Sequence, residues 1–250
     1  SIGKSAFKNC TSLSTIEGVS EVTTVGEMCF ENCKVLESPH FTNKLTTIGN
    51  RAFRNCYALT TIETAGIETV GDMSFENCFH ITSLHFSLKH TTIGDQAFAF
   101  CTSISSVTFE SQENANSIIS IGIRSFESCS TIESVFIEKV GSVKISEGAF
   151  KDCKLLTDFN YTVFDSISIG DSAFSNCPLT ESVLFNSTTV SISHHSFSSS
   201  LLKTVEFTSE VKNLNVESDS FSDCTNVNCV IVEDSLVSEV KKAFNEKVIN

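Results

Sequence analysis

Tryptophan is absent from this chain of 250 residues, and proline, methionine and tyrosine occur only twice each. No composition break and no linker rich in proline or glycine divides the chain, so we interpret residues 1–250 as one continuous array. No stretch approaches the roughly 18 consecutive apolar residues that a membrane-spanning helix needs. The sequence therefore excludes direct membrane insertion of this segment.

Basic residues are also scarce. The chain has 17 Lys and Arg against 30 Asp and Glu, for a net charge of −13. Such a balance excludes a nucleic-acid or anionic-lipid partner, because both select basic patches. The opening residues do not form a signal peptide and already lie inside a repeated pattern. Since repeat arrays need polar caps at their ends, we expect the chain to be a fragment of a longer protein, with any secretion signal or anchor outside it.

Phenylalanine, by contrast, is abundant and periodic. Of the 21 phenylalanines, one set recurs every 22 to 28 residues and is usually followed three positions later by cysteine. A fixed period in this range indicates a solenoid, a propeller or an array. The set predicts about eleven stacked coils, with the longest unit enlarged by the polar insertion at 111–117. Its members are Phe7, Phe30, Phe53, Phe75, Phe98, Phe126, Phe150, Phe174, Phe197, Phe221 and Phe244.

The residues around each phenylalanine follow a consensus. A β-branched aliphatic stands five positions before it, as at Ile48, and in most units glycine follows, as at Gly49. Such a glycine suits a positive φ or a close backbone approach. A small residue such as Ala52 precedes the phenylalanine and predicts tight packing between coils. Segments such as ITSLHF and ISSVTF alternate with period two and predict one strand per coil, whereas the short AFxNC segment predicts a single helical or 3₁₀ turn.

The two segments IGNRAFRNCYALTTI and IGDQAFAFCTSISSVTF show the motif L-x-x-I-x-I followed by I-G-x-x-A-F-x-x-C. In this motif the chain resembles the BspA-like leucine-rich repeat family, which includes surface proteins of bacteria and parasitic protists. The resemblance covers essentially the whole chain and weakens after about Phe197. It implies an α/β, β-dominated fold, a right-handed leucine-rich-repeat solenoid with a parallel sheet along one face and about eleven coils of 22–28 residues.

Eleven cysteines raise the alternative of a disulfide framework. Their repeated placement favours a column of small buried thiols instead, although pairing of some neighbours remains an alternative on geometric grounds. No further cysteine pair or histidine accompanies the Cys29–Cys33 spacing, so no metal site is predicted. The column contains Cys10, Cys33, Cys56, Cys78, Cys101, Cys129, Cys153, Cys177 and Cys224.

Catalytic and cofactor motifs are missing from the sequence. No G-x-S-x-G, phosphate-binding loop, HExxH or EF-hand pattern occurs. The pair His194 and His195 has no carboxylate or cysteine at motif spacing, so both are interpreted as solvated turn residues. We therefore predict no catalytic residues, no cofactor and no enzyme activity.

A better candidate is the outward face of the predicted strands. Residues seven positions past the column cysteines stand above a row of small polar neighbours. Phe136 and Leu184 are apolar members of this row, with Asn160 and Tyr161 beside them. Exposed apolar clusters mark protein contacts, although isolated apolar surface residues are also normal. The predicted partner-binding face comprises Glu17, His40, Glu63, His85, Phe136, Asn160, Leu184 and Glu206.

The resemblance implies a non-enzymatic protein-binding or adhesion module at the cell surface or secreted, with extracellular matrix or a host cell surface as partner. The alternative is an intracellular protein-interaction scaffold in the cytoplasm, which unpaired thiols favour because cytosolic proteins keep cysteine reduced. The sequence does not indicate an oligomeric state.

Overall fold

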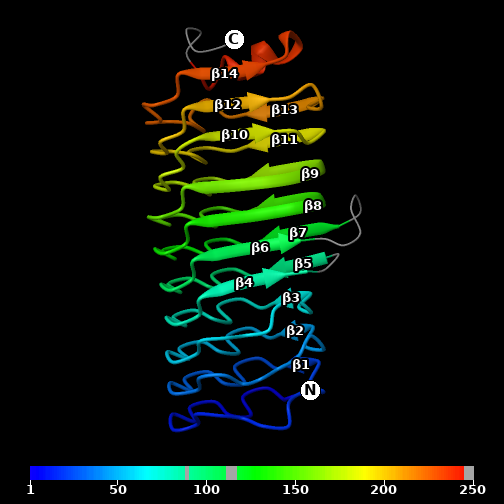
Figure 1. Ribbon diagram of the computed structural model, residues 1–250, viewed down its shortest axis with the longest axis vertical. Coiled ribbons are helices and arrows are strands. Elements are labelled where there is room, and N and C mark those ends of the chain that lie inside the picture. Colours follow the sequence, from blue (N-terminus) through cyan, green and yellow to red (C-terminus); the bar gives the residue numbers. More distant parts are fainter. Residues whose placement is uncertain (88–89, 111–116, 245–250) are drawn as a thin grey trace.

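The computed structural model shows an elongated solenoid whose coils stack along one axis from the N-terminal to the C-terminal end (Figure 1). It describes residues 1–87, 90–110 and 117–244. Most of the insertion at 111–117 therefore lies outside the described residues. The predicted class, a β-dominated solenoid with parallel strands, is confirmed.

One ladder of parallel strands follows the whole stack. It starts with a bridge between Ile2 and Val25 and then runs in the order β1-β2-β3-β5-β7-β8-β9-β11-β13. Each strand ends on the β-branched residue five positions before the column phenylalanine, so register places Val25 beside Ile48 and Ile48 beside Val70. The shorter strands are β1 (Thr24–Val25), β2 (Thr47–Ile48), β3 (Thr69–Val70), β5 (His90–Ile93), β7 (Ile118–Ile121), β11 (Thr189–Ile192) and β13 (Asn213–Val216).

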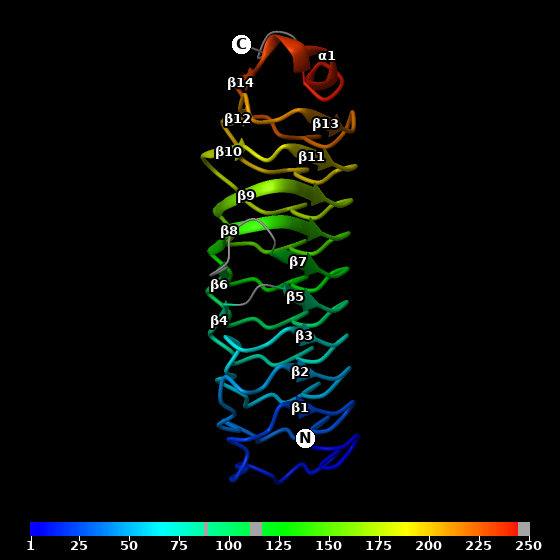
Figure 2. The ribbon, with the colours of Figure 1, turned by 90° about the vertical axis from the view of Figure 1, so that its right-hand side faces the viewer.

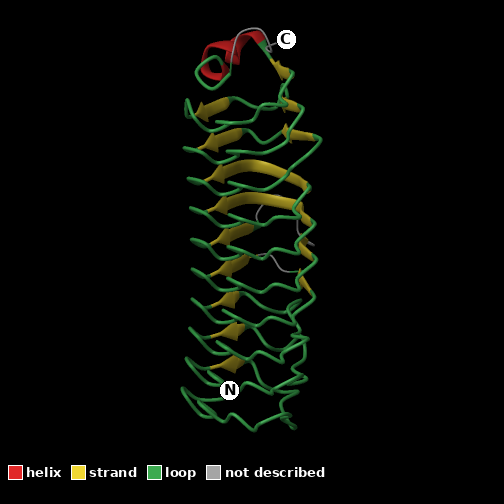
Figure 3. Cartoon of the chain, turned by 90° about the vertical axis from the view of Figure 1, so that its left-hand side faces the viewer, coloured by secondary structure: helices red, strands yellow, loops and turns green. Residues whose placement is uncertain are grey.

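A second row of strands lies on another face of the coils (Figure 2). It consists of β4 (Ser83–Phe86), β6 (Ser106–Glu110), β10 (Ser182–Phe185), β12 (Thr204–Phe207) and β14 (Cys229–Val232). The long strands β8 (Ser134–Ile145) and β9 (Asp158–Ile169) belong to both rows and bend from one face to the other (Figure 3). This second row is the one predicted from segments such as ITSLHF. The ladder through Val25, Ile48 and Val70 was not predicted, because strands of two residues show no alternation of apolar and polar residues.

The column phenylalanines form a continuous stack of rings inside the solenoid. From Phe7 to Phe221, successive ring centroids lie 4.9–5.3 Å apart and the ring planes differ by 2–11°. This spacing is close to the separation of neighbouring strands, so each coil contributes one ring at the same height. Ring pairs of this kind add about 0.5–1.5 kcal/mol beyond the burial of apolar area. The stack is therefore the main packing element of the core.

The AFxNC segment is not the predicted helical turn. Its backbone N–H groups alternate: Ala6, Lys8 and Cys10 donate to carbonyl groups three residues earlier. Ser5, Phe7 and Asn9 donate instead to carbonyl groups of the next coil, and Ser5 and Asn9 adopt positive φ angles of 57° and 63°. The alternation links every coil to its neighbour through the turn. Asparagine suits the second of these positions because it tolerates the left-handed region better than most residues.

The repeated glycines are explained by close approach alone. A Cβ atom on Gly71 would lie 2.5 Å from the backbone nitrogen of Asn50 in the preceding coil, while its φ angle is not in the left-handed region. A Cβ atom on Gly3, in the first coil, would meet nothing within 4 Å. Glycine is thus needed where another coil packs below it.

The column cysteines are unpaired thiols in the structure. The Sγ atom of each thiol from Cys33 onward donates to the carbonyl oxygen of the column phenylalanine one coil earlier, as in Cys129 to Phe98 at 3.0 Å. Burial raises the pKa of Cys33 to about 11 and that of Cys129 to about 12. Cys10 differs from the prediction: in the first coil it is exposed because no earlier coil covers it.

The predicted count of about eleven coils is too high. The first unit contributes only the bridge at Ile2, and the unit at Phe244 follows the 3₁₀ helix η2 (Asp234–Leu236) and the helix α1 (Val237–Val240) instead of a strand. Leu236 and Val240 are buried against the last coil. The ring of Phe244 tilts by 37° from that of Phe221, so the regular stacking ends there.

Candidate functional site

The predicted binding residues lie on the outer face of the second strand row. Register places His85 opposite Thr108, Thr108 opposite Phe136, and Phe136 opposite Asn160. In the three-stranded sheet, Leu184 lies opposite Glu206. Glu17, His40 and Glu63 are exposed too, in coils whose second row has no assigned strand. Phe136 and Glu206 are only half-exposed.

The second row is interrupted between β9 and β10. No pairing joins these strands, so β10, β12 and β14 form a separate sheet, and Asn160 and Leu184 do not lie in one ladder. Beyond the gap, the coils that contain β9 and β10 are again joined by hydrogen bonds. The Thr188 N–H donates to the Phe164 carbonyl oxygen at 3.2 Å, and the Ser187 hydroxyl donates to the Val163 carbonyl oxygen at 2.8 Å. The interruption is therefore local.

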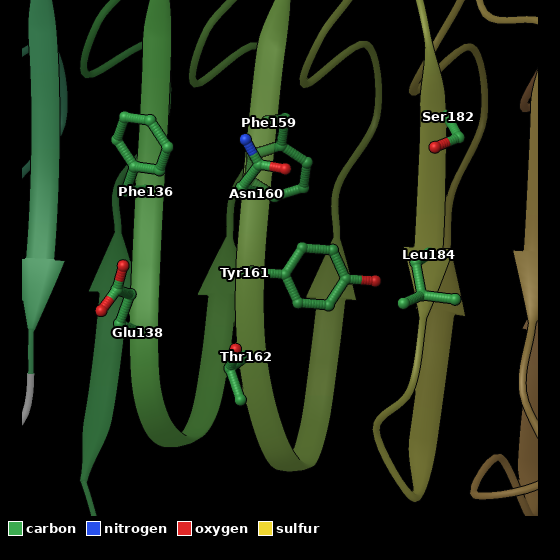
Figure 4. A pocket seen from close by; sticks show the side chains of 8 residues that line it. All are labelled: Phe136, Glu138, Phe159, Asn160, Tyr161, Thr162, Ser182 and Leu184. Atoms are coloured by element: carbon green, nitrogen blue, oxygen red, sulfur yellow. The ribbon is translucent and has the colours of Figure 1, made fainter.

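The ring of Tyr161 lies at this gap (Figure 4). Tyr161 pairs with Ile137 and so occupies an inward position that phenylalanine fills in β6 and β10. Its ring lies 5.2 Å from that of Phe159 and 6.0 Å from that of Phe185, and it extends from β9 towards β10 (Figure 4). The hydroxyl oxygen is buried without a hydrogen-bond partner, and this burial raises the pKa of Tyr161 well above its usual value.

A pocket of about 390 Å³ opens over this gap (Figure 4). Its volume lies within the usual range of ligand sites, roughly 300–1,000 Å³. Phe136 on β8 and Leu184 on β10 stand on its two sides, so the apolar pair predicted from the sequence does come together around one cavity. The lining residues are Phe136, Glu138, Phe159, Asn160, Tyr161, Thr162, Ser182 and Leu184.

Glu138 is the charged member of this lining, and a second carboxylate stands next to it. Register places Glu110 directly opposite Glu138 on the neighbouring strand. Among the described residues, no ion pair or hydrogen bond involves either carboxylate. Like charges placed directly opposite one another in a sheet are destabilising. Within the described residues, the pocket edge therefore carries two carboxylates and no basic group paired with them.

The histidine pair lies elsewhere and has carboxylate partners that the sequence analysis missed. His194 Nδ1 lies 2.7 Å from the Asp219 carboxylate, and His195 Nδ1 lies 3.0 Å from the Ser222 hydroxyl. The hydrogen bond that His194 donates to the Asp219 carboxylate raises the pKa of His194. These partners are 25 and 27 residues away. The repeat period, which brings residues one unit apart together, is the signal that would have found them.

Within the described parts of the chain, no group of three or more histidine, cysteine or acidic side chains is arranged to hold a metal ion. The same residues contain no helix with the length and apolar character needed to cross a bilayer.

Sequence comparison supports the assignment of the fold. The BspA type leucine rich repeat region matches residues 1–115 and 110–228. The chain belongs to this family of leucine-rich repeat proteins, as the motif around the column phenylalanines predicts. Among curated proteins, none shows significant sequence similarity to the chain.

Solved structures that resemble the chain include three leucine-rich repeat proteins. A leucine rich repeat protein of T. pallidum is 20% identical, with a TM-score of 0.48 over 71% of this chain and 70% of that one. A leucine rich cell surface protein of Faecalibacterium prausnitzii is 17% identical, with a TM-score of 0.41 over 97% and 86% of the two chains. A leucine-rich repeat protein of Bacteroides ovatus is 18% identical, with a TM-score of 0.40 over 100% and 87%. Similarity at this level does not bear on function.

Proposed function

We propose that the chain is a non-enzymatic protein-binding module that engages its partner through the outer face of the second strand row. The pocket between β9 and β10 is the observation that carries this proposal, because it gathers an exposed leucine, a half-exposed phenylalanine and several polar groups around one cavity on this face. Aromatic residues near the centre of a face are the usual anchors of protein interfaces. A rigid sheet also limits the conformational entropy lost on binding.

We further propose that the module acts at the cell surface or after secretion, as an adhesion protein that contacts extracellular matrix or a host cell. The family membership supports interaction with other proteins. An intracellular scaffold is the alternative, and the unpaired column thiols favour it. Antibody labelling of intact cells that produce the protein separates the two: labelling only after permeabilisation would favour the scaffold.

Binding itself is tested with the double variant Phe136→Ser and Leu184→Ser. The purified protein is titrated onto immobilised extracellular-matrix proteins and onto intact cultured cells. We expect the double variant to bind at least tenfold more weakly than the unmodified chain, since both anchors of the pocket are removed. The control is Leu155→Ser with Leu201→Ser, which removes two exposed leucines that do not line the pocket.

Circular dichroism should be the same for all three proteins, because every substituted residue is at least partly exposed. Equal binding by the two double variants would contradict a role for the pocket. No binding of the unmodified chain to any of these surfaces would contradict adhesion.

A further inference from the structure

The pocket combines features that select one kind of ligand. Its edge carries the carboxylate of Glu138, with Glu110 opposite it in register and no basic residue lining the cavity. An anionic group would add to the repulsion already present between the two carboxylates. A neutral group would leave that repulsion unchanged. A cation placed beside Glu138 would instead relieve it.

Three aromatic side chains belong to the same lining. Phe136, Phe159 and Tyr161 all line the cavity, and their ring faces attract cations through the quadrupole of the π-system. A planar guanidinium group stacks on such rings and is more weakly hydrated than an ammonium group, so it loses less on leaving water. Aromatic rings beside a carboxylate thus favour arginine over lysine.

The buried hydroxyl of Tyr161 also favours a ligand that donates hydrogen bonds. In the described structure its oxygen has no hydrogen-bond partner, although a buried polar group without one is costly. The ring lies between β9 and β10, over the floor of the pocket (Figure 4). A guanidinium group carries five N–H donors and no acceptor, so it suits a cavity whose lining offers acceptors: the Glu138 carboxylate, the Asn160 amide oxygen and, on the β10 side of the ring, this oxygen (Figure 4).

We propose that the pocket between β9 and β10 binds an arginine side chain of the partner protein. The guanidinium group lies against Phe136 and Tyr161 and pairs with Glu138, while Leu184 packs against the aliphatic stem. This inference rests on the proposed function, because it names the chemistry by which the same face recognises its partner.

The first test uses a small probe in place of the unidentified partner. The acetylated and amidated tripeptide Gly-Arg-Gly is titrated into the protein while the ring resonances of Tyr161 and Phe136 are followed by NMR. We expect saturable shifts at millimolar peptide that weaken as salt is added. The same peptide with citrulline, which has nearly the same shape but no charge, should bind about tenfold more weakly, since it loses both the ion pair and the cation–π contact.

The variants locate the site. Glu138→Gln should weaken arginine-peptide binding about fivefold and leave citrulline-peptide binding unchanged, because only the charge is removed. Glu210→Gln is the matched control: Glu210 is exposed between β12 and β13, outside both this pocket and the proposed binding face, and we expect no effect. Equal binding of the arginine and citrulline peptides, or no shift of Tyr161 and Phe136 with either, would overturn the proposal.

A second experiment separates this inference from the proposed function. Arginines of a matrix protein that binds the chain are blocked with phenylglyoxal, and its lysines are acetylated in a parallel sample. Loss of binding on arginine blocking alone supports both ideas. If the Phe136 and Leu184 double variant loses binding but arginine blocking has no effect, the proposed function stands and the arginine inference fails. If the tripeptide binds but the double variant keeps full binding to the matrix protein, the arginine inference stands and the proposed function fails.

Discussion

Replacing Tyr161 with phenylalanine should make the protein more stable and, at the same time, a weaker binder. The change removes one buried hydroxyl oxygen that has no hydrogen-bond partner and keeps the ring that fills the gap between β9 and β10. Phenylalanine is also the residue found at this inward position in β6 and β10. The variant should therefore pack without rearrangement.

The expected gain follows from the cost of an unsatisfied buried polar group, about 1–3 kcal/mol. The side chain of Tyr161 is only partly buried as a whole, although its oxygen is covered, so we take the lower limit of about 1 kcal/mol. With a urea m-value of about 1–3 kcal/mol/M, the midpoint of unfolding should rise by roughly 0.3–1 M. Equilibrium unfolding followed by circular dichroism measures this shift.

The chain provides its own control, because Tyr57 is its other tyrosine. The Tyr57 ring stacks on Phe79 on the surface, and its oxygen is not among the buried atoms without a partner, so Tyr57→Phe should leave the midpoint unchanged. A lower midpoint for Tyr161→Phe, or an equal rise for both variants, would refute the reasoning. In the tripeptide titration, Tyr161→Phe should lower the affinity for the arginine peptide severalfold while raising stability, a trade-off expected at a binding site.

Three further predictions concern the rest of the solenoid. Gly71→Ala should lower the free energy of unfolding by about 1–3 kcal/mol in a urea titration, because its Cβ would overlap the Asn50 backbone, whereas Gly3→Ala should change it by less than about 0.5 kcal/mol. In a thiol-labelling assay at pH 8, Cys10 should react rapidly, while Cys33 and Cys129, with pKa values raised to about 11 and 12, should react only after unfolding; rapid labelling of all three would contradict a closed core. His194 has a raised pKa in the folded chain, so its pairing with Asp219 stabilises the fold below the unfolded pKa of about 6.5 and is lost as the pH rises through the folded value. In hydrogen exchange, corrected for the pH dependence of the intrinsic exchange rate, the C-terminal coils should therefore be better protected at pH 6 than at pH 8. Asp219→Asn should remove this difference.

The core of the fold was predictable because one side chain recurs at one height in each coil. The positions of Phe53 and Cys56 have equivalents in most units at nearly constant spacing, and this periodicity predicts stacked coils. The ladder through Val25 and Ile48 was not predictable, because strands of two residues carry no alternation. The conformation of the turn at Ser5 and Asn9 was not predictable, because local sequence does not reveal that half of its N–H groups donate to the next coil.

The candidate site was predictable in part. The outward row and the pair Phe136 and Leu184 follow from counting positions past the column cysteines. The pocket between them is lined in part by Tyr161, whose side chain is one hydroxyl longer than its counterparts in β6 and β10 and lies between two strands (Figure 4). Local pattern does not show that β9 and β10 are left unpaired at this point. Nor does it show the contact of His194 with Asp219, which only the repeat period brings together.

The hydrogen bonds between the turn segments of neighbouring coils also determine which insertions and deletions such a protein tolerates. Ser5, Phe7 and Asn9 each bond to the residue one unit further along, and the same pattern recurs at Met28, Phe30 and Asn32. Removing or duplicating one entire unit would rejoin surfaces that already fit, whereas losing a single residue would misalign every later bond. Gene rearrangements that respect unit boundaries are thus the mutations this architecture tolerates best.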